Sequence, residues 1–281
     1  CLQINEVPEN LSDYYPRDYY SFKRVQEKKS LKNRLHLRRV NATIFNRGII
    51  SKIVHLFFPV EKYELINNLD LNKKSKIVDV GTGNGAFFLY ELSELGFSNL
   101  LGIDPFLDEN IEYKNGLRIL KKDFRDLEGS WDLIIFHHSF EHMPDPKIIF
   151  EKIKTLLTLK GTCMLVIPTV SSFAWKHYGI HWAQLDAPRH LYLHSIESMN
   201  KLASSTGLFV KKVLYNSTDF QFAGSEKYLQ GISLKEQIQN KYKEGLFKRK
   251  FRKWKYRQMA NKLNSRGEGD QAVFFVQIKQ N

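Results

Sequence analysis

Three glycines at alternate positions, Gly81, Gly83 and Gly85, give this sequence its clearest chemical signal. They follow an apolar run at residues 76–80 and precede a stretch with helical spacing, so the segment predicts a strand, a tight loop and a helix. Glycine adopts backbone dihedrals that other residues avoid, and it lets a ligand approach with no Cβ in the way. We therefore predict that a ligand binds against this loop.

Two classes of ligand fit the loop. The spacing Gly81-x-Gly83-x-x-Ala86 satisfies the dinucleotide fingerprint, which indicates an NAD-dependent oxidoreductase or epimerase. The second class comprises positively charged ligands. Asp79 favours it, because a carboxylate two residues before the first glycine repels a pyrophosphate and attracts a cation. S-adenosylmethionine, which carries a sulfonium and an ammonium group, is such a cation. The sequence also lacks a Tyr-x-x-x-Lys pair after the strand predicted at 131–136, which disfavours the oxidoreductase.

The segment from Val78 to Gly85 resembles the first motif of the class I S-adenosylmethionine-dependent methyltransferases, apolar-Asp-apolar-Gly-x-Gly-x-Gly. The resemblance covers roughly residues 74–215 and, within the family, extends to the small-molecule and glycan methyltransferases. It implies an α/β, Rossmann-like fold with a seven-stranded, mostly parallel sheet and helices on both faces. It also implies that S-adenosylmethionine is the cofactor and that Asp79 and the three glycines hold its methionine portion.

The resemblance extends to five further cofactor-binding residues. Asp104 would accept hydrogen bonds from two ribose hydroxyls, and Pro105 would border the adenine. Asp123 and Phe124 resemble the acidic-aromatic pair that meets the adenine edge. His137, at the end of the fourth predicted strand, would line the same pocket.

The richest polar cluster of the chain follows that strand, at residues 137–146, and contains His138, Glu141 and His142. It resembles the Glu-His-x-x-Asp-Pro stretch of many small-molecule methyltransferases. It lacks the Asn/Asp-Pro-Pro-aromatic motif of enzymes that methylate nucleobase amino groups. These His and Glu side chains are also conceivable metal ligands, but no further matching ligand set is evident. We therefore predict no metal and expect Glu141 and His142 to shape the loop.

A second loop, at residues 175–194, is rich in aromatics and histidines and contains a Pro-Arg-His-Leu run typical of glycan, lipid and secondary-metabolite enzymes. Loops after the carboxyl ends of strands bind substrates in such folds. Because histidine titrates nearest neutrality, His138 and His190 are our candidates for the base that deprotonates a hydroxyl acceptor. For each of them, a purely structural role is the alternative.

The elements that must position these residues follow from periodicity. Strands are predicted at 76–80, 100–104, 117–120, 131–136, 161–168, 208–215 and 271–278, and helices at 146–157 and 195–207. Residues 220–268 would form a helical insertion before the last strand. Within it, Lys241 to Arg257 predicts a basic amphipathic helix with an aromatic stripe at Phe247, Phe251 and Trp254. The stripe either packs on the domain or meets an anionic partner, which would be a membrane surface, a lipid-linked phosphate or RNA.

The first 72 residues differ in character from the rest, so we predict an N-terminal extension at 1–72 and a methyltransferase domain at 73–281. A basic helix is expected from Lys23 to Arg39, either as a solvated helix or as a lid over the site. The helical spacing of Ile49, Ile53, Phe57 and Val60 favours packing in the core over membrane contact.

Composition supports a globular enzyme with an affinity for anions. The chain has a formal net charge of +13, only two cysteines and no run of about 20 apolar residues. We expect a reduced, cytoplasmic protein that associates with the inner face of the membrane, and Cys1 in place of Met leaves open what precedes the chain. The predicted reaction is O-methylation of a small-molecule, glycan or lipid-linked acceptor, with RNA methylation as the alternative.

Overall fold

The computed structural model describes residues 1–9, 14, 30–45, 48–85, 87–233, 236 and 245–280, which divide into two compact units. Unit 1 comprises Cys1–Tyr14, His138–Phe150 and Leu165–Lys279, and unit 2 comprises Tyr15–His137, Glu151–Met164 and Gln280–Asn281. The predicted domain boundary at residue 72 remains a prediction. The N-terminal part of the predicted basic helix, residues 23–29, lies outside the described residues.

The strands follow the order β4-β5-β3-β2-β6-β7-β10-β9. They are β2 (Ile77–Val80), β3 (Leu100–Ile103), β4 (Ile111–Glu112), β5 (Arg118–Leu120), β6 (Trp131–His137), β7 (Leu157–Pro168), β9 (Leu208–Tyr215) and β10 (Gln271–Ile278). The pairs β2–β3, β2–β6 and β3–β5 are parallel, and β4–β5 and β10–β9 are antiparallel. The Rossmann-like α/β prediction is confirmed, with an eighth strand, β4, that is too short to leave a periodic pattern in the sequence.

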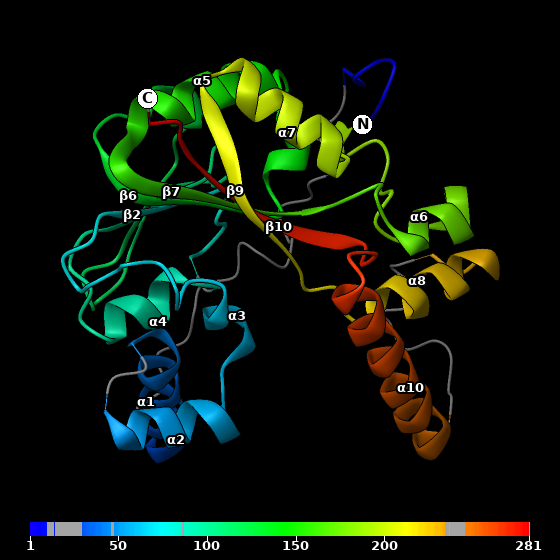
Figure 1. The fold of residues 1–281 in the computed structure, drawn as a ribbon, viewed down its shortest axis with the longest axis horizontal. Coiled ribbons are helices and arrows are strands. Elements are labelled where there is room, and N and C mark those ends of the chain that lie inside the picture. The colour runs from blue at the N-terminus through cyan, green and yellow to red at the C-terminus, as the bar shows by residue number, and fades with distance from the viewer. Residues whose placement is uncertain are drawn as a thin grey trace. The chain divides into compact units, whose positions relative to one another are not determined.

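In unit 2, the parallel strands are built from apolar runs because both faces of such a sheet are covered. All four residues of β2 are buried. The helices of this unit are α1 (Leu31–Phe45), α2 (Ile49–Phe57), α3 (Glu61–Glu64) and α4 (Leu89–Glu94). Figure 1 shows α1 and α2 packed against each other. The described part of the predicted basic helix, from Leu31 to Arg39, belongs to α1, and residues 23–29 of that prediction lie outside the described residues.

The prediction that the stripe of α2 packs in the core is wrong. The helix forms where its periodicity indicated, but none of its residues is buried. Ile49 is 79% exposed, and Ile53 and Phe57 are also exposed. Within the described residues, α1 covers only part of α2, which leaves an apolar face in water. Exposed apolar patches of this kind usually mark surfaces that bind a protein or a membrane.

In unit 1, the last two strands form an antiparallel pair, with Ala272 opposite Tyr215 and Ile278 opposite Leu208. The predicted helix before β9 is α7 (Ile196–Ser205), and Ser195 caps it by accepting a hydrogen bond from the backbone N–H of Ser198. The other helices that lie wholly in this unit are α6 (Phe173–Tyr178), α8 (Phe220–Leu229) and α10 (Leu246–Ser265). A short strand, β1 (Leu2–Gln3), pairs with β8 (Tyr192–Leu193).

Helix α10 is attached to unit 1 by its second half (Figure 1). Ala260 is buried in a cluster with Trp182 and Phe222, and Tyr256 packs against that cluster. The predicted aromatic stripe belongs to the first half, where Phe247 is 91% exposed and Trp254 is 59% exposed. The stripe is thus not part of the core. No helix in the described ranges is long and apolar enough to span a bilayer.

Candidate functional site

The glycine loop after β2 adopts the backbone that its sequence predicted. Gly81, Gly83 and Gly85 have φ values of 69°, 57° and 73°, which lie in the left-handed region that favours glycine. The backbone N–H of Gly83 donates to Oδ2 of Asp104 at 2.9 Å. Oδ1 of Asp104 accepts from the N–H of Phe106, also at 2.9 Å. This carboxylate therefore fixes the loop to the end of β3, and each of its oxygens retains a further lone pair.

Asp79 and Asp104 form a pair of buried acids at this loop. Oδ2 of Asp79 accepts a hydrogen bond from Thr82 at 2.7 Å, whereas its Oδ1 is buried with no hydrogen-bond partner in the described structure. Burial raises the pKa of Asp79 to about 7, the Thr82 hydrogen bond opposes the rise, and the charge of Asp104 adds to it. Burial also raises the pKa of Asp104. An orphaned acceptor beside a second carboxylate suits a cationic ligand and opposes a pyrophosphate.

Gly85 is required by packing as well as by its dihedrals. A Cβ at this position would lie 2.6 Å from Cδ1 of Ile119. We expect Gly85→Ala to lower the free energy of unfolding by about 2–4 kcal/mol, from the left-handed backbone and the overpacking together. Gly116→Ala is the matched control in the same unit, since Gly116 has φ +85° and a Cβ there would meet nothing within 4 Å. Urea unfolding should show the larger loss for Gly85→Ala, and equal losses would contradict the packing argument.

The other predicted cofactor residues also belong to unit 2. His137 ends β6 and stacks on Phe87 with ring centroids 3.9 Å apart. Pro105 follows Asp104 and is half-buried. Asp123 is partly exposed and caps a short 3-10 helix at Phe124–Asp126. Phe124 itself is 1% exposed and packs on Phe136. Of the predicted acidic-aromatic pair, only Asp123 therefore has its side chain at the surface.

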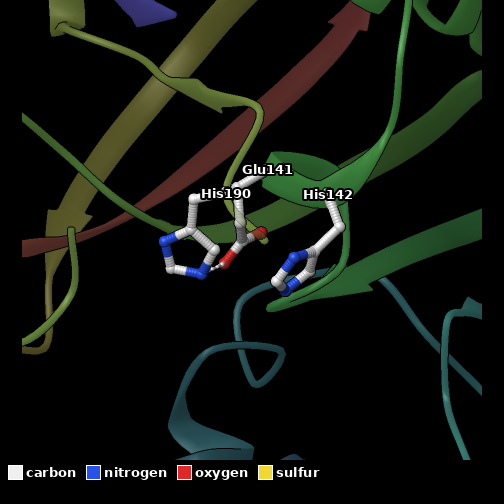
Figure 2. Close-up of side chains that lie close together, drawn as sticks. All are labelled: Glu141, His142 and His190. Atoms are coloured by element: carbon white, nitrogen blue, oxygen red, sulfur yellow. Dashed lines mark ion pairs between the residues drawn. The ribbon is translucent and has the colours of Figure 1, made fainter. Parts of the chain in front are cut away.

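The two base candidates belong to unit 1 and meet at one carboxylate, Glu141, which Figure 2 shows beside His190. Nδ1 of His138 lies 3.2 Å from Oε1 of Glu141, and Nε2 of His190 lies 3.9 Å from the same oxygen. Glu141 is fully buried in the 3-10 turn Phe140–His142. Nδ1 of His190 donates to the carbonyl of Gln184 at 2.9 Å. The structure therefore brings His138 and His190 together as neighbours of one acid.

Electrostatics separates the two histidines. Burial lowers the pKa of His190 to about 4, so this ring is neutral at pH 7. Burial also acts to lower the pKa of His138, but the hydrogen bond and charge of Glu141 outweigh it and raise that pKa above its usual value. Burial would raise the pKa of Glu141, yet the His138 hydrogen bond and the neighbouring histidines lower it to about 2. The hydrogen bond from His138 is the largest of the interactions that lower the pKa of Glu141.

Two features of unit 1 could not be predicted from the sequence. The first is that Glu141 lies next to both His138 and His190. The only signal for it in the sequence was the His-x-x-Glu spacing within one turn. The second is Asp270, a buried acid at the start of β10 that accepts hydrogen bonds from Trp182 at 3.0 Å and Gln184 at 2.8 Å. Because the carbonyl of Gln184 also binds His190, Asp270 helps to hold the loop that carries this histidine. Residues some 86 positions apart leave no local pattern.

A family model described as "Methyltransferase domain" (Methyltransf_23) matches residues 47–213. No curated protein matches the chain.

Several solved structures are similar to the chain at low sequence identity. Mycolic acid cyclopropane synthase CmaA1, complexed with SAH and CTAB, is 18% identical with a TM-score of 0.50 and is matched over 86% of this chain and 93% of its own. The cyclopropane synthase MmaA2 from Mycobacterium tuberculosis is 16% identical with a TM-score of 0.49, over 77% and 82% of the two chains. The mitomycin 7-O-methyltransferase MmcR is 10% identical with a TM-score of 0.46, over 87% and 54%.

Proposed function

The chain belongs to the methyltransferase domain family, and from this premise we propose that it methylates an oxygen atom of a small-molecule, glycan or lipid-linked acceptor with S-adenosylmethionine as methyl donor. The bound donor supplies an activated methyl group on a sulfonium, so the protein must chiefly align the acceptor and take up its proton. The observation that carries the proposal is the pair of buried carboxylates, Asp79 and Asp104, at the glycine loop. A cationic donor would offset the cost of burying them together.

The residues of unit 2 fit such a donor. The orphaned Oδ1 of Asp79 is available to a positively charged group, and the remaining lone pairs of Asp104 are available to the two ribose hydroxyls. Gly81 and Gly83 have no Cβ to fill the space at the loop. Pro105, Asp123 and His137 remain our proposals for the adenine side of the ligand, together with Phe124.

The affinity for S-adenosylmethionine should rise with pH. In the free protein, Asp79 is mostly protonated below its pKa of about 7, and a cation binds best to the ionised form. We expect about tenfold tighter binding at pH 8 than at pH 6, as the ionised fraction grows from about a tenth to about nine tenths. Calorimetric titration across this range measures it, with Asp79→Asn as the variant whose profile should be flat.

The same titration tests the oxidoreductase alternative. A pyrophosphate would bind less well as Asp79 ionises, so the affinity for NAD would fall with pH. A flat profile for S-adenosylmethionine in the wild-type chain, or measurable binding of NAD with the opposite slope, would contradict the proposal. Transfer of a tritiated methyl group to candidate acceptors then identifies the product.

We propose that His138 is the base that takes up the proton of the acceptor hydroxyl, with His190 as the second candidate. The side chain of His138 is 34% exposed, whereas that of His190 is 7% exposed, so His138 is the one that an acceptor can reach. Glu141 orients the His138 ring through Nδ1. This pairing of a histidine with a buried carboxylate is the usual arrangement for a general base.

We also propose that α10 brings the enzyme to an anionic membrane surface. The helix contains eight Lys or Arg residues and no acidic residue. Its exposed Phe247, Phe251 and Trp254 add apolar area on a helix otherwise covered with cations. Helices of this composition lie in the membrane interface, where cations meet lipid headgroups and aromatics enter the acyl boundary. In unit 2, the exposed face of α2 offers a second apolar surface of the same kind.

Vesicle binding tests this surface. We expect the chain to bind vesicles with about 30% anionic lipid, and the double variant Phe247→Ser, Phe251→Ser to bind them at least tenfold more weakly, since each aromatic contributes about 1.5–3 kcal/mol when buried. Ile180→Ser is the control, because Ile180 is similarly exposed elsewhere in unit 1. Equal binding of neutral and anionic vesicles would contradict the proposal. Salt-dependent binding of RNA without vesicle binding would favour the RNA methyltransferase alternative.

A further inference from the structure

We propose that Glu141, His142 and His190 bind one divalent transition-metal ion of the zinc class. Figure 2 shows the carboxylate of Glu141 between the two imidazole rings. One ligand atom from each of the three residues lies within 4.8 Å of the others. The residues come from two loops of unit 1, the turn after β6 and the segment before β8, so the fold and not local sequence brings them together.

The two histidines are oriented as metal ligands are. Nδ1 of His190 donates to the carbonyl of Gln184, and Nδ1 of His142 donates to the carbonyl of Arg189, each at 2.9 Å. A carbonyl only accepts, so in each neutral ring the proton is on Nδ1 and the lone pair is on Nε2. Metal-binding histidines are usually fixed in this tautomer by a backbone carbonyl or a carboxylate. Nε2 of His190 lies 3.9 Å from Oε1 of Glu141.

Glu141 supplies the second, independent observation. Its side chain is fully buried, and Oε2 has no hydrogen-bond partner among the described residues. Oε1 already forms a hydrogen bond with Nδ1 of His138. A buried carboxylate oxygen without a partner is a rare and costly feature, which indicates that an ion or a water molecule binds there. A cation that binds both carboxylate oxygens would satisfy Oε2, because Oε1 is the oxygen that lies 3.9 Å from Nε2 of His190.

The types of ligand atom determine which metal ions suit the site. Two imidazoles and one carboxylate suit Zn²⁺ and its neighbours Co²⁺, Fe²⁺ and Mn²⁺, whereas Mg²⁺ and Ca²⁺ prefer oxygen ligands. Bonds of about 2.0–2.1 Å in a tetrahedral site place ligand atoms about 3.4 Å apart. The atoms of this set lie within 4.8 Å of one another, with Nε2 of His190 at 3.9 Å from Oε1 of Glu141, so the side chains must rotate inward when the ion binds. Three protein ligands leave a position open, as in catalytic zinc sites.

The metal site is additional to the proposed function and changes the role of one histidine in it. His190 becomes a metal ligand, and His138, which contacts Glu141 from outside the ligand set, remains the candidate base. An acceptor oxygen in the open position would lose its proton more readily. The metal site does not depend on which acceptor or methyl donor the enzyme uses.

The test measures metal and not activity. The full chain, free of any histidine tag, should retain one Zn²⁺ per molecule by elemental analysis and should bind Co²⁺ one-to-one with the visible absorption of a low-symmetry site. Glu141→Gln, His142→Gln and His190→Gln should each weaken Zn²⁺ binding at least a hundredfold in calorimetric titration. His177→Gln is the control, since His177 is an exposed histidine of the same unit.

Either of two results would overturn the proposal. The first is a wild-type chain that binds neither Zn²⁺ nor Co²⁺ stoichiometrically at micromolar concentration. The second is a loss of metal in His177→Gln as large as in His142→Gln. The wild-type measurement stands even where a variant does not fold. A chain that binds metal but transfers no methyl group would reject the proposed function alone.

Discussion

Replacing Asp104 with alanine should weaken the binding of S-adenosylmethionine at least tenfold. The variant removes a charged acceptor that we assign to two ribose hydroxyls, and hydrogen bonds to charged groups contribute about 1.5–3 kcal/mol each. It also leaves the backbone N–H groups of Gly83 and Phe106 without their acceptor, so the glycine loop loses its attachment to β3. Calorimetric titration of the folded variant measures the affinity, and thermal unfolding measures the cost to the fold.

Asp108→Ala separates the local effect from a general loss of negative charge. Asp108 is an exposed acid four residues further along the chain, and its removal should change neither affinity nor stability appreciably. If Asp104→Ala folds and binds S-adenosylmethionine as tightly as the wild-type chain, the assignment of Asp104 to the cofactor is wrong. If Asp108→Ala weakens binding equally, the effect is one of net charge.

The sheet could be predicted because its strands are short apolar runs bounded by glycine, proline and acids. Residues 208–215 and 271–278 form β9 and β10 as expected, and the other long strands differ by a few residues at their ends. Strand β4 has only two residues, which is too short for any period to show. Packing, unlike periodicity, could not be predicted. The stripe of α2 has the spacing of a buried helix and yet is exposed, since periodicity fixes the face of a helix but not what covers it.

The candidate site was predictable to the extent that its residues are adjacent in sequence. Asp79 and the glycines form a contiguous motif, and the structure gives them the backbone and the buried charge that the motif indicated. Glu141 was expected only to shape its loop, although it is the acid at which three histidines converge. That convergence depends on His190, some 50 residues later in the chain, and on the carbonyl groups that orient it. Contacts of this kind follow from the fold and leave no spacing to detect.

His138→Ala should lower turnover by about two to four orders of magnitude, the usual contribution of a general base. The affinity for S-adenosylmethionine should change little, because the base acts only on the acceptor. The expected pattern is therefore a fall in kcat and in kcat/KM with an unchanged KM for the methyl donor. Single-turnover transfer of a tritiated methyl group to the identified acceptor measures it.

The matched control is His177→Ala, which removes an exposed histidine of α6 whose ring contacts the neighbouring rings of Phe173 and Tyr178. His190→Ala should also lower turnover, either as the second candidate base or through loss of the metal ligand. The two cases differ because only the second is accompanied by loss of bound Zn²⁺. If His138→Ala and His190→Ala both keep full activity on the true acceptor, neither histidine is the base. The proton would then leave through another group, or the acceptor would react already ionised.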